Sequence, residues 1–171
     1  MRKYEFTGET RKIQLMFRTV TLHRIRAVIS FGLVDAGELG GWIEKEENLS
    51  HEGKAWVWGN AEVWGNAEVC GDAKVWGNAE VWGNAEVFSA SHVLVIGPIG
   101  SRNDFTTFYR DRDNEITVKC GCFLGKIDKF LEKLTRTHGN SKYALVYRAA
   151  VEVAKLQIDL SDEAPEEDGE E

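Results

Sequence analysis

The sequence predicts a mainly β protein, in which a short solenoid of strands lies between an N-terminal β cap and a small C-terminal α+β domain. Three observations lead to this prediction. A six-residue phrase recurs from residue 56 to 88, alternating apolar and polar residues precede it, and apolar residues at helical spacing follow it. The expected boundaries are 1–42 for the cap, 43–95 for the solenoid, 96–158 for the α+β domain and 159–171 for an acidic tail.

The N-terminal segment is expected to form extended structure. The stretch VTLHRIRAVISF alternates as a strand does, and GLVDAGELGGWIE follows as a glycine-rich lead into the solenoid. An open solenoid end exposes apolar core and strand edges, so this segment is predicted to cap the first coil. From Arg2 to Arg26 its bases outnumber its acids by seven to two. We interpret them as a solvated strand face, with a basic patch for an anionic ligand as the alternative.

The central repeat reads V-W-G-N-A-E. Valine recurs every six residues from Val57 to Val87, and alanine does so from Ala55 to Ala85. In an extended segment alternate side chains face opposite sides, so alanine and valine share a buried face while glutamate and tryptophan face outward. Gly-Asn or Gly-Asp then turns the corner. A helix does not fit, because a period of six carries the apolar residues around its surface.

This phrase resembles the hexapeptide repeat of left-handed β-helix proteins, whose three-sided coils take three hexads per turn. The resemblance covers about residues 43 to 95 if Ile43 and Leu49 keep the alanine phase. It implies that residues eighteen positions apart stack on one another. The outer pairs expected to stack are Trp58 with Trp76, Trp64 with Trp82, Asn60 with Asn78, and Asn66 with Asn84, the asparagines hydrogen-bonding along the corners.

Two outer faces of the coil would then display tryptophan. Exposed aromatic surface of this extent marks an interface, and trimers are usual among hexapeptide-repeat proteins. We therefore expect a homo-oligomer, with a trimer favoured, whose interface residues are Trp58, Trp64, Trp76 and Trp82. The alternative is that these rings cover strand edges of their own chain.

The C-terminal domain holds the predicted ligand site. Strands around an Asp-Asn turn are expected first, then one helix that includes Leu124 and closes at His138-Gly139, and a second that opens at Ser141. The loop GPIGSRND and the strands after it offer backbone amides, hydroxyls and cations, which suit a phosphate or nucleotide. The predicted ligand-binding residues are Gly100, Ser101, Arg102, Asn103, Thr106, Thr107, Arg110 and Lys119. The alternative is an ordinary surface turn.

The sequence gives little indication of metal or catalytic chemistry. Cys120-Gly121-Cys122 has no second pair at zinc-site spacing, so neither a metal nor a cofactor is expected. Hexapeptide-repeat acyltransferases use a histidine as base, often near a loop extruded from the coil. Here the hexads run without insertion, and only His51 and His92 flank them, each without an evident acidic partner. We expect no catalytic residue.

The net charge of −7 belongs to the end of the chain. DLSDEAPEEDGEE holds eight of the 28 acids, which leaves 20 acids against 21 bases in the remainder. A near-neutral body argues against direct DNA binding, and the tail is predicted to be disordered. The first residues lack the apolar run of a signal peptide, and no stretch has the length that spans a bilayer. We expect a cytoplasmic protein of a bacterial host, without membrane association.

The whole layout resembles small hexapeptide-repeat proteins carried by phages and prophages. The matching parts are GELGGWIEKEENLSHEGKAWVWGNAEV, the near-identical hexads, and the SRNDFTTFYR and CGCFLGKIDKF segments. The resemblance implies a non-enzymatic, self-associating binding protein that sequesters a host factor or a nucleotide-like signal, as an anti-defence protein would. The alternatives are a hexapeptide-type acyltransferase, which would bind coenzyme A, and a structural virion component.

Overall fold

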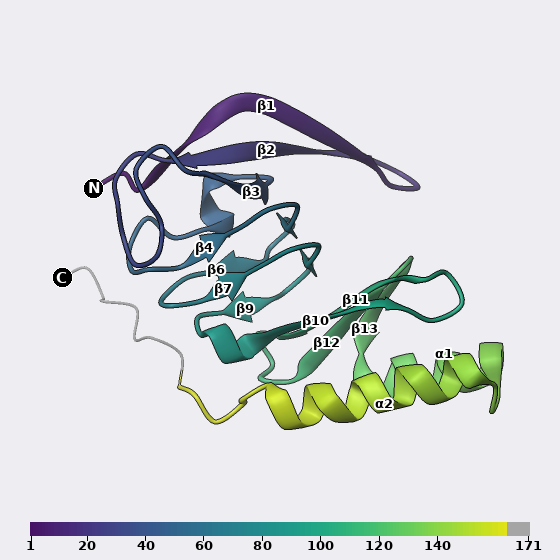
Figure 1. Cartoon of the computed structure of the whole chain (residues 1–171). Coiled ribbons are helices and arrows are strands. Elements are labelled where there is room, and N and C mark those ends of the chain that lie inside the picture. The colour runs from purple at the N-terminus through teal and green to yellow at the C-terminus, as the bar shows by residue number, and fades with distance from the viewer. Residues whose placement is uncertain (164–171) are drawn as a thin grey trace.

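The structure, a computed structural model, describes residues 1–163 and is mainly β with two helices at its C-terminal end (Figure 1). Residues 159–163 have no regular secondary structure, and the rest of the predicted acidic tail, 164–171, lies outside the described residues. No helix within residues 1–163 has the length and apolar character needed to cross a bilayer.

Six two-residue strands form stacked coils in the middle of the chain. They are β4 (Trp56–Val57), β5 (Glu62–Val63), β6 (Glu68–Val69), β7 (Lys74–Val75), β8 (Glu80–Val81) and β9 (Glu86–Val87). Strand β4 pairs with β7, β5 with β8 and β6 with β9, each in parallel with partners eighteen residues apart. One coil therefore takes eighteen residues and has three sides. The valines and alanines of the repeat are buried in one core, as predicted.

The first coil differs from the prediction in its phase. Ile43 pairs with Val63 and Leu49 bridges to Val69, so the two residues take the valine phase and the assignment to the alanine phase was wrong. Their partners are twenty residues away, whereas Trp56 pairs with Lys74, eighteen residues on. The first coil thus has two additional residues between Leu49 and Trp56. Isoleucine and leucine fit either inward phase, so their identity did not reveal this shift.

The N-terminal hairpin continues one side of the coil. Strand β1 (Tyr4–Gln14) pairs antiparallel with β2 (Thr19–Ala27), and β2 pairs antiparallel with β3 (Leu39–Ile43). Because β3 pairs in parallel with β5, the five strands form one sheet in the order β1-β2-β3-β5-β8. Tyr4 and Ile25 enter the same core as the repeat. The hairpin therefore covers one end of the coil stack and extends beyond it (Figure 1).

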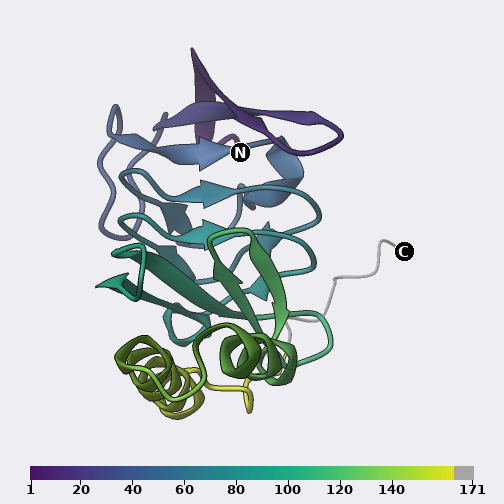
Figure 2. The ribbon, with the colours of Figure 1, turned by 90° about the vertical axis from the view of Figure 1, so that its right-hand side faces the viewer.

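A four-stranded antiparallel sheet covers the other end. It comprises β10 (Val93–Ile99), β11 (Asp104–Arg110), β12 (Ile116–Cys120) and β13 (Phe123–Lys126), in that order. Tyr109 packs into the coil core and donates to the Trp82 carbonyl at 2.8 Å, whereas Phe108 packs against the helices. Those helices are α1 (Ile127–His138) and α2 (Lys142–Gln157). Figures 1 and 2 show the sheet between the coils and the helices.

Two further expectations differ from the structure. Leu124, assigned to the first helix, lies in strand β13, and the helix begins only at Ile127. Leu124 has the helical spacing to Ile127 and Leu131, but it pairs with Lys119 across the sheet. The asparagine side chains at the corners form no hydrogen bonds with one another within residues 1–163. The backbone amide of Asn60 instead donates to the Gly77 carbonyl.

Candidate functional site

A pocket of about 150 Å³ lies between the four-stranded sheet and the two helices. We call it the helix pocket. Its walls come from strand β11 with the preceding loop, from the turn between β12 and β13, and from both helices. The lining residues used below are Ser101, Arg102, Asp104, Thr106, Cys120, Phe123, Phe130, Lys133, His138 and Tyr147.

The inner part of the helix pocket is aromatic. The rings of Phe123 and Phe130 are 5.3 Å apart, and Phe130 meets Tyr147 edge-on at 5.8 Å. Burial, followed by the neighbouring Cys120, raises the pKa of Tyr147 to about 12. The Tyr147 hydroxyl therefore stays neutral at physiological pH and can donate a hydrogen bond. This part of the pocket suits the flat face and edge of an aromatic ligand.

The rim of the helix pocket is cationic. Arg102 and Lys133 both line it, and within residues 1–163 neither forms an ion pair. The Lys133 ammonium lies 5.6 Å from the centre of the Phe123 ring. The one carboxylate of the lining, Asp104, accepts a hydrogen bond from the Phe105 amide. The two cations are thus available to an anion that enters the pocket.

Gly100 allows the loop before β11 to lie in direct contact with helix α2. Its φ is +78°, and a Cβ at this position would lie 1.9 Å from the Tyr147 hydroxyl oxygen. Only glycine combines this backbone conformation with such close contact. The loop that carries Ser101 and Arg102 is therefore held against Tyr147.

The eight predicted ligand-binding residues do not converge on one site. Ser101, Arg102 and Thr106 line the helix pocket, Gly100 adjoins it, and Asn103 is exposed in the turn with φ +51°. The remaining three face the coil, where their polar atoms have partners within the chain. Thr107 accepts from the Glu80 amide at 3.0 Å, Arg110 pairs with Glu86 at 3.1 Å, and Lys119 pairs with Glu80 at 3.0 Å.

Sequence reasoning missed the helical side of the pocket. Lys133, His138 and Tyr147 follow Arg102 by more than thirty residues and belong to helices that were interpreted only as apolar packing elements. No local motif connects them with the loop. The amphipathic pattern of α1 was the one signal that could have located Lys133. The buried residues Phe130 and Leu134 define the inner face of the helix, and Lys133 lies at the edge of that face.

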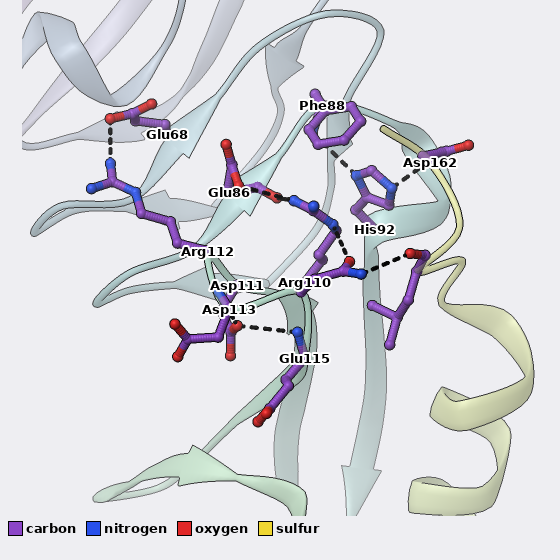
Figure 3. A network of polar contacts seen from close by, with 12 residues as sticks. Glu68, Glu86, Phe88, His92, Arg110, Asp111, Arg112, Asp113, Glu115 and Asp162 are labelled. Carbon is purple, nitrogen blue, oxygen red and sulfur yellow. Dashed lines mark hydrogen bonds and ion pairs between the residues drawn. The ribbon is translucent and has the colours of Figure 1, made fainter. Parts of the chain in front are cut away.

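His92 lies in a polar network at the junction of coil, sheet and C-terminal segment (Figure 3). The ring is fully buried; its Nδ1 accepts from the Phe88 amide at 3.3 Å, and its Nε2 lies 3.2 Å from an Asp162 oxygen. The expectation that His92 lacks an acidic partner was therefore wrong. Burial, and next the nearby Arg110, lower its pKa. With both nitrogens facing protein groups, His92 is not placed to act as a base on a substrate.

His51 is engaged by its own chain through one of its two nitrogens, and its buried Nε2 has no hydrogen-bond partner within residues 1–163. Its Nδ1 accepts from the Lys3 amide at 3.1 Å, and its ring stacks on Tyr4 at 4.2 Å. Burial is the main cause that lowers its pKa. Of the four histidines in the chain, His138 is the one that lines the helix pocket. Residues 1–163 contain no group of three or more His, Cys, Asp or Glu residues that could hold a metal ion.

The tryptophan stacks expected from the eighteen-residue repeat are confirmed. The ring centres of Trp58 and Trp76 are 4.1 Å apart and their planes are nearly parallel, whereas those of Trp64 and Trp82 are 3.8 Å apart and their planes are tilted by 47°. Their surroundings differ, however. Trp64 is only 5% exposed because it packs with Trp42 under the N-terminal hairpin, whereas Trp76 is 48% exposed. The oligomer interface stays a prediction, and the Trp58–Trp76 stack is the more accessible part of it.

Comparison with known proteins gives one partial match. No family model matches the chain. The uncharacterized acetyltransferase YdcK of Escherichia coli (strain K12) is 37% identical to it over 62 residues, which is 34% of this chain and 19% of that protein. The chain thus spans about a fifth of the length of the curated relative it matches.

Proposed function

We propose that this chain is a left-handed β-helix protein that captures a small anionic, nucleotide-like ligand in the helix pocket without transforming it. The observation that carries the proposal is the combination, in one pocket, of an aromatic interior with two cations that have no ion-pair partner within residues 1–163. The three parallel ladders with an offset of eighteen residues support the fold.

Each part of a nucleotide has a counterpart in the helix pocket. The Arg102 guanidinium and the Lys133 ammonium suit phosphate oxygens, because charge-assisted hydrogen bonds are the strong ones. Phe123 and Phe130 offer ring faces and edges on which a base stacks. The neutral Tyr147 hydroxyl can donate to a ring nitrogen or carbonyl. A non-catalytic role agrees with the engagement of His51 and His92 by their own chain.

Removing both cations is expected to abolish capture. The protein is titrated with adenosine and guanosine 5′-monophosphate by calorimetry, and native mass spectrometry of freshly purified protein identifies any retained ligand. Losing two charge-assisted contacts in Arg102→Ala/Lys133→Ala should weaken binding by at least about 100-fold. The melting temperature should change little, because both side chains are exposed and neither forms an ion pair within residues 1–163.

Arg136→Ala is the matched control for this double variant. Arg136 is exposed on the same helix as Lys133 but does not line the helix pocket. It should therefore bind either nucleotide with wild-type affinity. Equal affinity in the wild type and the double variant would contradict the proposed capture site.

An acyltransferase is the second candidate function, and the match to YdcK favours it. His138 would then be the base, since it is the histidine in the helix pocket. This function requires a complex with acetyl-coenzyme A in native mass spectrometry and acetyl transfer that His138→Ala abolishes while the complex persists. Nucleotide capture without an acetyl-coenzyme A complex favours the binding protein instead.

We also propose that the protein self-associates, with a trimer favoured, through the Trp58–Trp76 stack. The exposed Trp76, stacked on the half-buried Trp58, offers enough aromatic surface to anchor an interface. Trp58→Ala/Trp76→Ala should lower the mass measured by light scattering to that of the monomer. Trp82→Phe, on the side covered by Lys119, serves as control and should leave the mass unchanged. An unaltered mass in the double variant would assign the stack to packing within one chain.

The biological use of such capture is proposed from the resemblance to phage proteins alone. A self-associating protein that sequesters a host factor or a nucleotide signal would act as an accessory, anti-defence protein. A structural virion component would assemble with other viral proteins and retain no small ligand. Native mass spectrometry therefore separates these two roles as well.

A further inference from the structure

Cys120 and Cys122 place two free thiols on one tight turn. Cys120 ends strand β12, Gly121 and Cys122 form the turn, and Phe123 begins β13. Both cysteines line the helix pocket, so they lie on the face of the sheet that meets the helices. Cys122 is exposed and Cys120 is half-buried, so a small molecule that enters the pocket can reach them. We call the two residues the thiol pair.

The turn keeps the thiol pair close enough for a disulfide. Residues two positions apart have Cα atoms separated by no more than about 7 Å, and a disulfide joins Cα atoms about 4.4–6.8 Å apart. Gly121 has φ +55°, a left-handed conformation that reverses the chain. Cys120 then pairs with Phe123 across the hairpin, which brings the neighbouring Cys122 back toward it. The backbone therefore does not oppose a bond between the two sulfurs.

The surroundings of the thiol pair are rich in positive charge and hydrogen-bond donors. The Thr106 hydroxyl donates to the Cys120 sulfur at 3.4 Å. A Cβ on Gly121 would lie 3.2 Å from an Arg102 guanidinium nitrogen, and the Lys119 ammonium donates to the Gly121 carbonyl. Reactive cysteines occupy electropositive, partly exposed places of this kind, because the thiolate is the nucleophile and nearby positive charge favours it.

Cys70, the third cysteine of the chain, has the opposite surroundings. It is half-buried in the coil, and burial, followed by the carboxylates of Glu68 and Glu86, raises the pKa of its thiol. A thiol with a raised pKa stays protonated at neutral pH and reacts slowly. Cys70 is therefore an internal control for the reactivity of the thiol pair.

We propose that Cys120 and Cys122 form a redox-active dithiol that exchanges with small-molecule disulfides such as oxidised glutathione. The exposed Cys122 thiolate attacks one sulfur of that disulfide, forms a mixed disulfide and releases the first glutathione thiolate. The Cys120 thiolate then attacks the Cys122 sulfur, which closes the disulfide of the pair and releases the second. The two cysteines lose two protons and two electrons, and the oxidised glutathione gains them as two thiols. The proposal does not rest on nucleotide capture by the helix pocket.

Disulfide exchange of the full chain, in the absence of nucleotide, tests the site. The reduced protein is incubated at neutral pH with defined ratios of reduced and oxidised glutathione, the remaining thiols are alkylated, and the peptides are identified by mass spectrometry. The peptide with the thiol pair should lose two hydrogens and escape alkylation, whereas Cys70 should be alkylated. The pair should react at least about tenfold faster than Cys70. Excess reduced glutathione should restore both thiols.

Two single variants separate the two steps. Cys120→Ser should stop at the mixed disulfide and keep one glutathionyl group on Cys122, because no second thiol remains to release it. Cys122→Ser removes the exposed attacking thiol and should slow the reaction at Cys120 by about tenfold relative to the wild type. Cys70→Ser is the matched control and should close the disulfide of the thiol pair at the wild-type rate.

Circular dichroism spectra equal to that of the wild type verify that the variants are folded. The proposal is overturned if both thiols of the pair remain open to alkylation at every glutathione ratio, or if Cys70 reacts as fast as they do. A disulfide that joins two chains, seen on a non-reducing gel, would also overturn it.

Discussion

Replacing Trp56 by alanine is expected to destabilise the protein by about 3–5 kcal/mol, the usual cost of removing a large buried aromatic side chain. Trp56 is fully buried and meets Phe31 edge-on at 5.3 Å and Tyr4 at 6.1 Å. Its ring also fills the space beside Gly40, where a Cβ would lie 2.7 Å from the ring. The indole thus joins the N-terminal hairpin to the first coil. Urea unfolding followed by circular dichroism measures the loss.

Trp76→Ala is the matched control, because it removes the same side chain from an exposed position of the repeat. Measured at a protein concentration low enough for the monomer, because the proposed self-association also uses Trp76, it should cost less than about 1 kcal/mol. Trp56→Phe should retain part of the packing and fall between the two. Equal losses at Trp56 and Trp76 would contradict the assignment of Trp56 to the core.

Lys3→Met is expected to stabilise the protein at pH 7 by about 1–3 kcal/mol. Lys3 is 1% exposed, and its ammonium donates to the carbonyls of Glu52 at 3.2 Å and Ala55 at 2.9 Å, with no carboxylate paired to it within residues 1–163. Burial lowers its pKa from 10.5 to about 8. The methionine removes the buried charge, and the loss of the two hydrogen bonds offsets part of the gain.

The same substitution should change how stability depends on pH. Because the pKa of Lys3 is lower in the folded state, the unfolded chain binds more protons between about pH 8 and 10.5. The free energy of unfolding of the wild type therefore rises with pH through this window. Below about pH 8 the buried ammonium destabilises the folded state to its full extent. Unfolding free energies at several pH values should show a smaller rise in Lys3→Met than in the wild type and in the exposed control Lys12→Met. Parallel curves for all three proteins would show that Lys3 is not a buried cation.

The repeat was the part of the fold that could be predicted most fully. A period of six with two inward residues fixes the valine and alanine core, and three phrases per coil fix the tryptophan stacks. Trp56 shows where this reasoning ends. It occupies the outward, glutamate position of its phrase, yet it is buried because Tyr4 and Phe31 cover it. A local pattern describes which side of its own strand a residue faces, not which distant segment covers that side.

The candidate site was predicted only in part for a similar reason. The loop with Ser101 and Arg102 was found from its composition, and it does border a pocket. Thr107 and Lys119 were grouped with it because they follow in sequence, but they lie on the sheet face that meets the coil. Alternation separates the two faces of a strand without showing which one meets the solenoid. Lys133 and Tyr147 reach the same pocket only because the two helices pack against the sheet, and the sequence alone did not specify that packing.

Because paired residues of the repeat are eighteen positions apart, the number of hexads determines on which side of the coil the four-stranded sheet lies relative to the N-terminal hairpin. Adding or deleting three hexads would lengthen or shorten the stack by one coil and return the four-stranded sheet to the same side of it. Deleting a single hexad would instead turn that sheet by one side of the triangular coil relative to the N-terminal hairpin. Arg18 and Leu124 would then no longer meet on the same face. Variation in repeat number within such chains is therefore expected to be tolerated in whole coils and selected against in thirds of a coil.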